Sequence, residues 1–265
     1  MIRHRFSKNE KRIIGLIHLQ PLPGTPFYEK GSFQKLMNTA LESAEALKKG
    51  GAHGCLIQTV DRVYSKNDET DLARVVALTK ITDAIAQIAA DGFQIGVQVM
   101  RNANKAALSI AKLCEGSFIR AETLVGMNLT PHGLIEADPI GLMEYRNKID
   151  AFEIDIVADI HTRHFQWHNA SKPVEQIAKY AQMVGANSVC VESKNEEKLS
   201  VMIKKINNVC PDLPIILSGY TNHENAKRLL ENADGAFVGS CFEKHGWGGV
   251  IDEEKVAKYM DIVAR

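Results

Sequence analysis

Polar side chains that could do chemistry gather most densely between residues 159 and 164, which contain Asp159, His161 and His164. A carboxylate and two imidazoles so close in sequence could transfer protons or bind a divalent metal ion. We predict Asp159 and His161 as acid–base catalysts and His164 as a substrate contact. The alternative is that all three are satisfied by local hydrogen bonds.

Two further residues are candidate catalysts. His18 ends an apolar run and precedes the loop Leu19–Gly24, whose prolines would fix its position. It could instead be a hydrogen-bonded core residue. Glu122 could act as a base or a metal ligand, or it could pair with Arg120.

Other polar residues near the ends of apolar runs are candidate substrate contacts. Arg101 and Asn102 could hold a substrate oxygen, although Asn102 could instead cap the following helix. Glu192 could serve as a base or ligand, or it could pair with Lys194. The predicted substrate-binding set is Gln58, Gln98, Arg101, Asn102, Arg120, His164 and Glu192.

Two glycines carry the most specific signal. Ser218–Gly219 and Gly239–Ser240 each follow an apolar run late in the chain. Glycine allows backbone N–H groups to approach an anion closely, and the serine hydroxyls add donors. We predict a phosphate site at Ser218, Gly219, Gly239 and Ser240, with two tight turns as the alternative.

The elements that must position these residues alternate between two types. Eight short runs rich in β-branched residues are predicted strands: Arg12–His18, Gly54–Thr59, Gln94–Met100, Ser117–Ala121, Glu153–Asp159, Asn187–Glu192, Pro214–Ser218 and Gly235–Gly239. Eight segments favour helices: Ser32–Lys49, Glu69–Ala90, Asn104–Cys114, Pro139–Lys148, Pro173–Val184, Glu196–Asn208, Glu224–Glu231 and Asp252–Val263.

This alternation predicts parallel βαβ units, and the continuous apolar runs indicate strands covered on both faces. Eight units in a chain of this length predict an α/β fold of the (β/α)₈ barrel type, as one domain over residues 1–265. An open doubly wound sheet is the alternative, but no G-x-G-x-x-G follows the first run. We expect the longest loops, 19–31, 60–68, 122–138 and 161–172, to lie at the functional end of the barrel.

Composition excludes several classes of protein. The 265 residues include 32 Lys and Arg against 32 Asp and Glu, so there is no basic excess of the kind that nucleic-acid binding requires. The apolar fraction of 45% argues against disorder. We therefore expect no nucleic-acid partner but a small-molecule ligand, phosphorylated or nucleoside-like. A homo-oligomer is compatible with the sequence.

No apolar stretch is long enough to span a membrane or to form a secretory signal, so we expect a cytoplasmic protein. The five cysteines, Cys55, Cys114, Cys190, Cys210 and Cys241, form no C-x-x-C pair. This spacing argues against a disulfide framework or a zinc–cysteine site. No cofactor is required by any motif, although a divalent metal remains compatible with the acidic and histidine residues.

Several segments together resemble one family. Residues Ile14–Pro26 look like the N-terminal signature of the BtpA/SgcQ family. Further matching segments follow in the expected order: Val99–Ala103, Phe118–Arg120, Ala158–Ile160 with His164, Ser218–Thr221 with Asn225, and Ala233–Gly235 with Val238–Ser240. The resemblance implies a ribulose-phosphate-binding type of barrel. It links the chain either to photosystem I biogenesis or to carbohydrate utilisation with a nucleosidase-like role.

The chain departs from the family pattern after three strands, at Gln58–Arg62, Ala121–Thr123 and Glu192–Asn195. We expect an enzyme of carbohydrate or nucleoside metabolism with nucleosidase, isomerase, epimerase or lyase chemistry. The alternative is a non-catalytic assembly factor that retains a ligand pocket.

Overall fold

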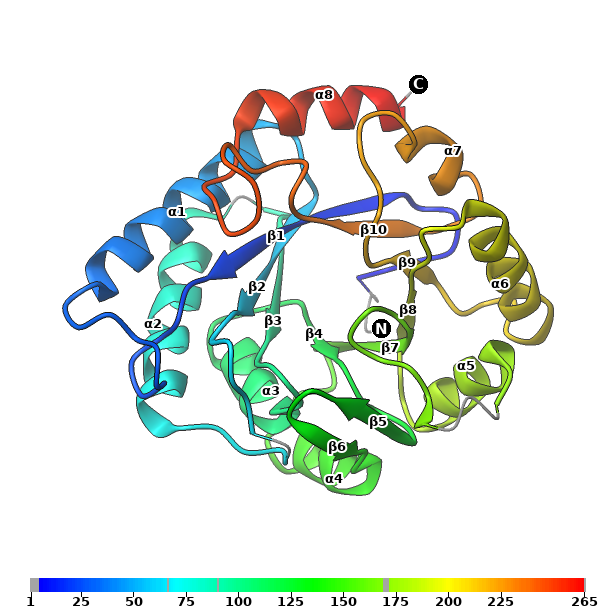
Figure 1. The fold of residues 1–265 in the computed structure, drawn as a ribbon, viewed down its shortest axis with the longest axis horizontal. Helices are drawn as coiled ribbons and strands as arrows, with labels where there is room; N and C mark the ends of the chain where they lie inside the picture. Colours follow the sequence, from blue (N-terminus) through cyan, green and yellow to red (C-terminus); the bar gives the residue numbers. More distant parts are fainter. Residues whose placement is uncertain (1–4, 66, 90, 169–171, 265) are drawn as a thin grey trace.

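The computed structural model describes residues 5–65, 67–89, 91–168 and 172–264. Eight parallel strands close into a barrel in the order β1-β10-β9-β8-β7-β4-β3-β2, with helices around it (Figure 1). The (β/α)₈ prediction is therefore confirmed, and the open doubly wound sheet is excluded. The strands are β1 (Arg12–Leu19), β2 (Gly54–Thr59), β3 (Gln94–Gln98), β4 (Phe118–Ala121), β7 (Asp155–His161), β8 (Ser188–Val191), β9 (Ile215–Leu217) and β10 (Gly235–Val238).

The barrel strands form from apolar runs because both of their faces are covered. Strands β2 and β3 are buried along their whole length. Side chains that point inward, including Ile14, Leu56 and Phe237, form one buried cluster, and those that point outward join a larger core under the helices. This two-sided burial explains why the sequence shows little polar–apolar alternation in these runs.

The helices cover the outside of the barrel (Figure 1). They are α1 (Phe33–Lys49), α2 (Leu72–Ile88), α3 (Asn104–Leu113), α4 (Pro139–Lys148), α5 (Val174–Met183), α6 (Glu196–Val209), α7 (Ala226–Leu230) and α8 (Glu253–Ala264). Helix α2 starts later than predicted because the Asp71 carboxylate caps it, accepting from the N–H groups of Ala73 and Arg74 at 2.8 and 3.3 Å. Ala90, the last residue of the predicted second helix, lies outside the described residues.

The stretch 122–138, predicted to be irregular, contains an antiparallel hairpin. Strands β5 (Met127–Thr130) and β6 (Gly133–Glu136) pair across the Pro131–His132 turn. The prediction was wrong here because the alternation of exposed and buried residues spans only four residues per strand. Gly133 adopts a φ of 113°, which suits glycine at this turn.

The N-terminal segment closes the end of the barrel where the strands begin. Phe6 is buried against Phe118 and Phe237, with ring centroids 5.2 and 6.3 Å apart. The N–H of Arg5 donates to Asp155 at 2.6 Å, and Gln94 donates to the carbonyl of Arg5 at 2.9 Å. The opposite end, where the strands finish, has a cavity.

Candidate functional site

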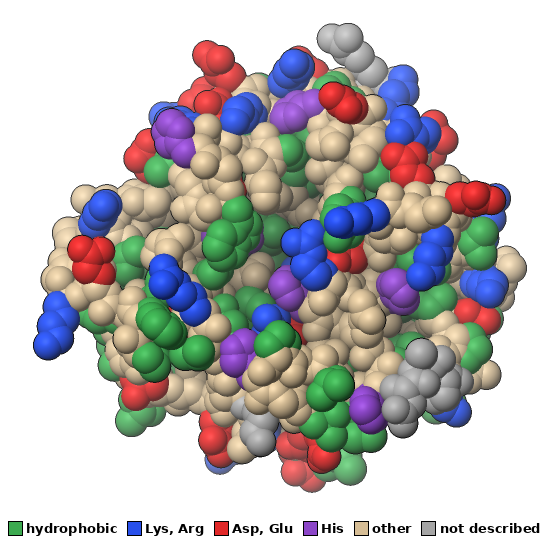
Figure 2. Space-filling view, in the orientation of Figure 1, with side chains coloured by type: hydrophobic (Ala, Val, Ile, Leu, Met, Phe, Trp, Pro, Cys, Tyr) green, Lys and Arg blue, Asp and Glu red, His purple; other side chains and the backbone are tan. Residues whose placement is uncertain are grey.

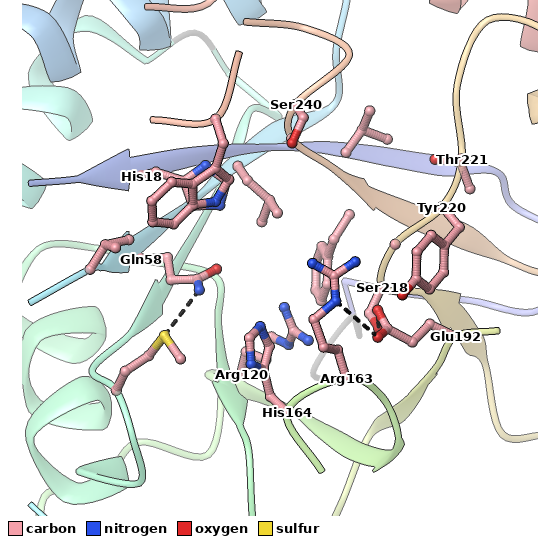
Figure 3. Close-up of a pocket in the computed structure, with 18 of the residues that line it drawn as sticks. His18, Gln58, Arg120, Arg163, His164, Glu192, Ser218, Tyr220, Thr221 and Ser240 are labelled. Atoms are coloured by element: carbon pink, nitrogen blue, oxygen red, sulfur yellow. Dashed lines mark hydrogen bonds and ion pairs between the residues drawn. The ribbon is translucent and has the colours of Figure 1, made fainter. Parts of the chain in front are cut away.

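A cavity of about 640 Å³ lies at the C-terminal ends of the barrel strands. Figure 2 shows the hollow at the centre of this face, with Lys, Arg and His side chains around it. The cavity brings together ten of the predicted site residues: His18, Gln58, Arg101, Arg120, His164, Glu192, Ser218, Gly219, Gly239 and Ser240. Figure 3 shows several of these side chains converging from opposite sides of the barrel.

His18, at the end of β1, is oriented by a buried carboxylate. Its Nδ1 lies 2.8 Å from Oε1 of Glu243, whose side chain is fully buried. Because the carboxylate oxygen accepts, Nδ1 carries the proton in the neutral ring, and Nε2 is left as a proton acceptor. Glu243 also accepts from the N–H of Gly248 at 3.1 Å, which fixes the carboxylate. A histidine with an orienting carboxylate is the arrangement that general bases commonly use.

Asp159 lies behind Arg120 and does not line the cavity among the described residues. Its two oxygens accept from Nε and one terminal nitrogen of Arg120 at 2.9 and 3.0 Å. Thr162 adds a third hydrogen bond at 3.1 Å. Burial alone would lower the pKa of Arg120, but the Asp159 carboxylate outweighs it and the pKa is raised. Asp159 therefore holds a permanently charged Arg120 at the cavity floor.

Glu122 is fully buried behind Arg101. Arg101 donates to Oε2 of Glu122 at 3.2 Å and to Nδ1 of His164 at 3.1 Å. Burial raises the pKa of Glu122 to about 8, with a smaller contribution from Asp159, while Arg101 opposes the shift. Burial and the neighbouring Arg120, Arg101 and Arg163 lower the pKa of His164 to about 3, so this ring is neutral at physiological pH.

The loops after β9 and β10 make one wall of the cavity. A Cβ at position 219 would lie 2.6 Å from Oε2 of Glu192, and one at position 239 would lie 3.0 Å from Cε1 of His18. Both positions therefore favour glycine for close approach. The N–H groups of Gly219 and Ser240 have no acceptor within the described part of the chain, so they are available to a bound anion.

Three other predicted site residues, the candidate catalyst His161 and the candidate contacts Asn102 and Gln98, lie outside the cavity lining of the described residues. His161 donates from Nδ1 to the carbonyl of Glu192 at 3.2 Å. The side-chain amide of Asn102 donates to the carbonyl of Thr123 and accepts from the N–H of Thr123. Asn102 does not cap α3, because Ala103 is the N-cap of that helix. Gln98 is buried.

Two predicted contacts in the cavity lining, Gln58 and Glu192, have polar partners of their own. Gln58 donates to Sδ of Met100 at 3.0 Å. Glu192 accepts from Ser218 at 3.3 Å, lies 3.9 Å from Arg163, and has a pKa raised by burial. In the residues that the structure describes, no three His, Cys, Asp or Glu side chains gather as metal ligands.

Sequence reasoning missed several residues. Glu243 lies five positions after the end of β10. Its closeness to a predicted phosphate loop was the signal in the sequence that could have identified it as a site residue. Tyr64 and His132, whose ring centroids lie 5.2 Å apart, come from a loop and from the unforeseen hairpin. Tyr220 and Thr221 follow the predicted Gly219 directly. Trp247 was not missed: the sequence allows it to be a flap over the mouth or a cover of the barrel surface, and in the structure it lines the cavity, with ring centroids of Trp247 and His18 5.5 Å apart.

The helices described in the structure include none that is long and apolar enough to cross a membrane.

Comparisons with known proteins identify relatives over almost the whole chain. An uncharacterised protein of Archaeoglobus fulgidus is 30% identical over 253 residues, covering 95% of this chain and 98% of the relative. A photosystem I biogenesis protein, BtpA of Synechocystis, is 25% identical and covers 95% of this chain and 88% of its own.

A solved phosphoribosyl anthranilate isomerase, in complex with a reduced deoxyribulose 5-phosphate derivative, superimposes with a TM-score of 0.56 at 13% identity. The match covers 95% of this chain and 98% of the isomerase, and it shows a common fold. The model of the BtpA family matches residues 9–265. The chain therefore belongs to the BtpA family.

Proposed function

We propose that this protein binds a phosphorylated sugar or nucleoside-like molecule at the barrel mouth and acts on it by acid–base chemistry. The observation that carries the proposal is one cavity in which two glycine-containing loops face the His18–Glu243 pair. A purely structural barrel does not need this arrangement, because each polar group held in a confined site loses hydration.

The phosphate would bind at the loops after β9 and β10. The N–H groups of Gly219 and Ser240, which have no partner among the described residues, and the hydroxyl of Ser240 would donate to its oxygens. Barrels of this type commonly bind phosphate at the loops of their last two strands. The rest of the molecule would then extend toward His18 and the arginines across the cavity.

His18 would move the proton. Its Nε2 is the acceptor that the Glu243 hydrogen bond leaves free, and His18 is one of the residues that line the cavity. None of the described residues that line the cavity is a lysine. Isomerisation, epimerisation or N-glycosidic cleavage through proton transfer is therefore favoured over Schiff-base chemistry.

The binding half of the proposal is tested by calorimetry with sugar phosphates and the corresponding free sugars. Ser240→Asp adds a negative charge where the phosphate would lie, so we expect a loss of affinity of about tenfold or more. Asn208→Asp adds the same charge on α6, near the start of β9 at the other end of the barrel, and should bind as the wild type does. This phosphate site would be ruled out if Ser240→Asp bound the sugar phosphate and the free sugar with equal affinity and as tightly as the wild type does.

The catalytic half is tested on any compound that the wild type converts. Glu243→Gln keeps the shape of the side chain but weakens the orientation and charge support of His18, so we expect kcat to fall by about tenfold or more while affinity changes little. An unchanged kcat would remove the His18–Glu243 pair from the mechanism. Tight binding without turnover of any ligand would favour the assembly-factor role suggested by the resemblance to the Synechocystis relative.

A further inference from the structure

The cavity has a second group of donors on the side opposite the predicted phosphate loops. In the closed strand order, β4 lies four strands from β10, and β3 lies four strands from β9. Arg120 on β4 therefore faces the Gly239 loop across the barrel, and Arg101 after β3 faces the Gly219 loop. Both arginines line the cavity.

Arg120 is held rigidly with one end free. Asp159 occupies its Nε and one terminal nitrogen, and the guanidinium carbon lies 5.3 Å from the centre of the Phe237 ring. The other terminal nitrogen has no partner among the described residues. Because its orientation is fixed before a ligand arrives, this nitrogen can donate to an anion at little entropic cost.

His164 supplies a donor beside Arg120 (Figure 3). Arginine has only donors, so Nδ1 of His164 must accept from Arg101, and the ring proton therefore lies on Nε2. Burial, together with the three neighbouring arginines, keeps this ring neutral by lowering its pKa. His164 thus adds an N–H donor without needing a charge of its own.

The acidic side chains that pair with these arginines lie behind them, away from the cavity. Asp159 and Glu122 are fully buried and do not line the cavity within the part of the chain that the structure describes. Glu192 is the acidic residue in the described lining; it lies next to Ser218 and Arg163 and also interacts electrostatically with Arg120. A ligand near Arg120 and His164 therefore meets the donors of both side chains, with Glu192 as the acidic neighbour in the described lining.

We propose that Arg101, Arg120 and the Nε2–H of His164 form a second anion subsite, so that the substrate carries an anionic oxygen group at the end opposite its phosphate. This inference rests on the proposed function for the phosphate end only. The second group is a carboxylate or a second phosphate, which share the same donor requirements.

The test measures dissociation constants for matched ligands by calorimetry. Glucose 6-phosphate is compared with 6-phosphogluconate, which adds a carboxylate at the far end. Fructose 6-phosphate is compared with fructose 1,6-bisphosphate, which adds a phosphate. We expect at least one doubly anionic ligand to bind about tenfold more tightly than its partner, because charge-assisted hydrogen bonds are added. The pair that shows the difference identifies the group.

Variants locate the effect. His164→Phe removes the Nε2–H donor and should reduce the preference for the doubly anionic ligand to about twofold or less. Arg101→Gln is a second variant, which removes the charge of Arg101. It does not leave an unpaired buried charge, because the raised pKa of Glu122 allows this carboxyl group to be protonated. Lys204→Gln removes an exposed positive charge on α6 and should keep the full preference.

The outcomes separate the two proposals. Equal binding within both ligand pairs overturns the second subsite and leaves the phosphate site intact. If gluconate bound as tightly as 6-phosphogluconate and lost its binding in His164→Phe, the second subsite would be supported and the phosphate site overturned. Absence of binding by all five compounds overturns both.

Discussion

Two cavity-lining arginines each have a carboxylate on the side away from the ligand, Asp159 for Arg120 and Glu122 for Arg101. The sequence could identify these carboxylates as chemically notable but could not show which way they face. Asp159 balances the buried charge of Arg120, which would be costly if unpaired, whereas Glu122, with its pKa raised to about 8, serves Arg101 as a hydrogen-bond acceptor. At the residue scale, these acidic side chains orient the two arginines, and His18 lines the cavity with its Nε2 left as a proton acceptor.

A pH-dependent stability follows from Glu122. Its pKa is raised from the ordinary value of 4.5 to about 8, so the folded chain holds a proton that the unfolded chain has released. This contribution is complete below 4.5 and is lost as the pH rises through 8. Glutamine does not titrate, so Glu122→Gln should not lose this contribution as the pH rises. We expect the free energy of unfolding of Glu122→Gln, minus that of the wild type, to increase between about pH 5 and pH 9. The increase should exceed about 1.4 kcal/mol, the equivalent of one pKa unit.

Urea denaturation at each pH measures this difference. Glu231→Gln, on an exposed side chain after α7, is the control and should show no such trend. A difference that stays constant across the range would mean that Glu122 is ionised in the folded protein.

At the element scale, the β5–β6 hairpin helps to fix the loop that carries His164. Asn128 donates to the carbonyl of His164 and accepts from the N–H of Gln166 at 3.1 Å. The turn of the hairpin reaches the other side of the mouth, where His132 lies 3.2 Å from the carbonyl of Arg62. The hairpin thus bridges the loops after β2 and β7.

Asn128→Ala removes both hydrogen bonds to the loop 161–168. We expect a local loss of about 1–3 kcal/mol, seen as faster amide hydrogen exchange at residues 162–168, and a severalfold loss of ligand affinity. Leu129→Ala, at an exposed neighbouring position, is the matched control and should change neither. Wild-type exchange in Asn128→Ala would show that the loop is held without the hairpin.

At the scale of the whole molecule, the two ends of the barrel have different tasks. The N-terminal segment fills one end with Phe6, while the other end is lined with polar groups around a cavity. This separation is general for barrels of this kind, where stability is maintained at one end and function is built at the other.

Phe6→Ala tests the separation. Removing a buried ring from the Phe118–Phe237 cluster should lower the free energy of unfolding by about 3–5 kcal/mol while leaving ligand affinity nearly unchanged. Phe152→Ala, at an exposed phenylalanine, should cost much less. If the two variants lost equal stability, Phe6 would not close the barrel.

The sequence by itself determined the barrel, because eight apolar runs buried on both faces leave a strong local pattern. It also placed His18, Arg120, Ser218 and Gly239 near strand ends, which the closed sheet then brought to one cavity. Only the tertiary structure decided that Glu243 orients His18 and that Asp159 lies behind Arg120 rather than on the cavity. The physical reason is that side-chain direction and pairing across the barrel depend on contacts between residues 39 to 225 positions apart, which no local pattern records.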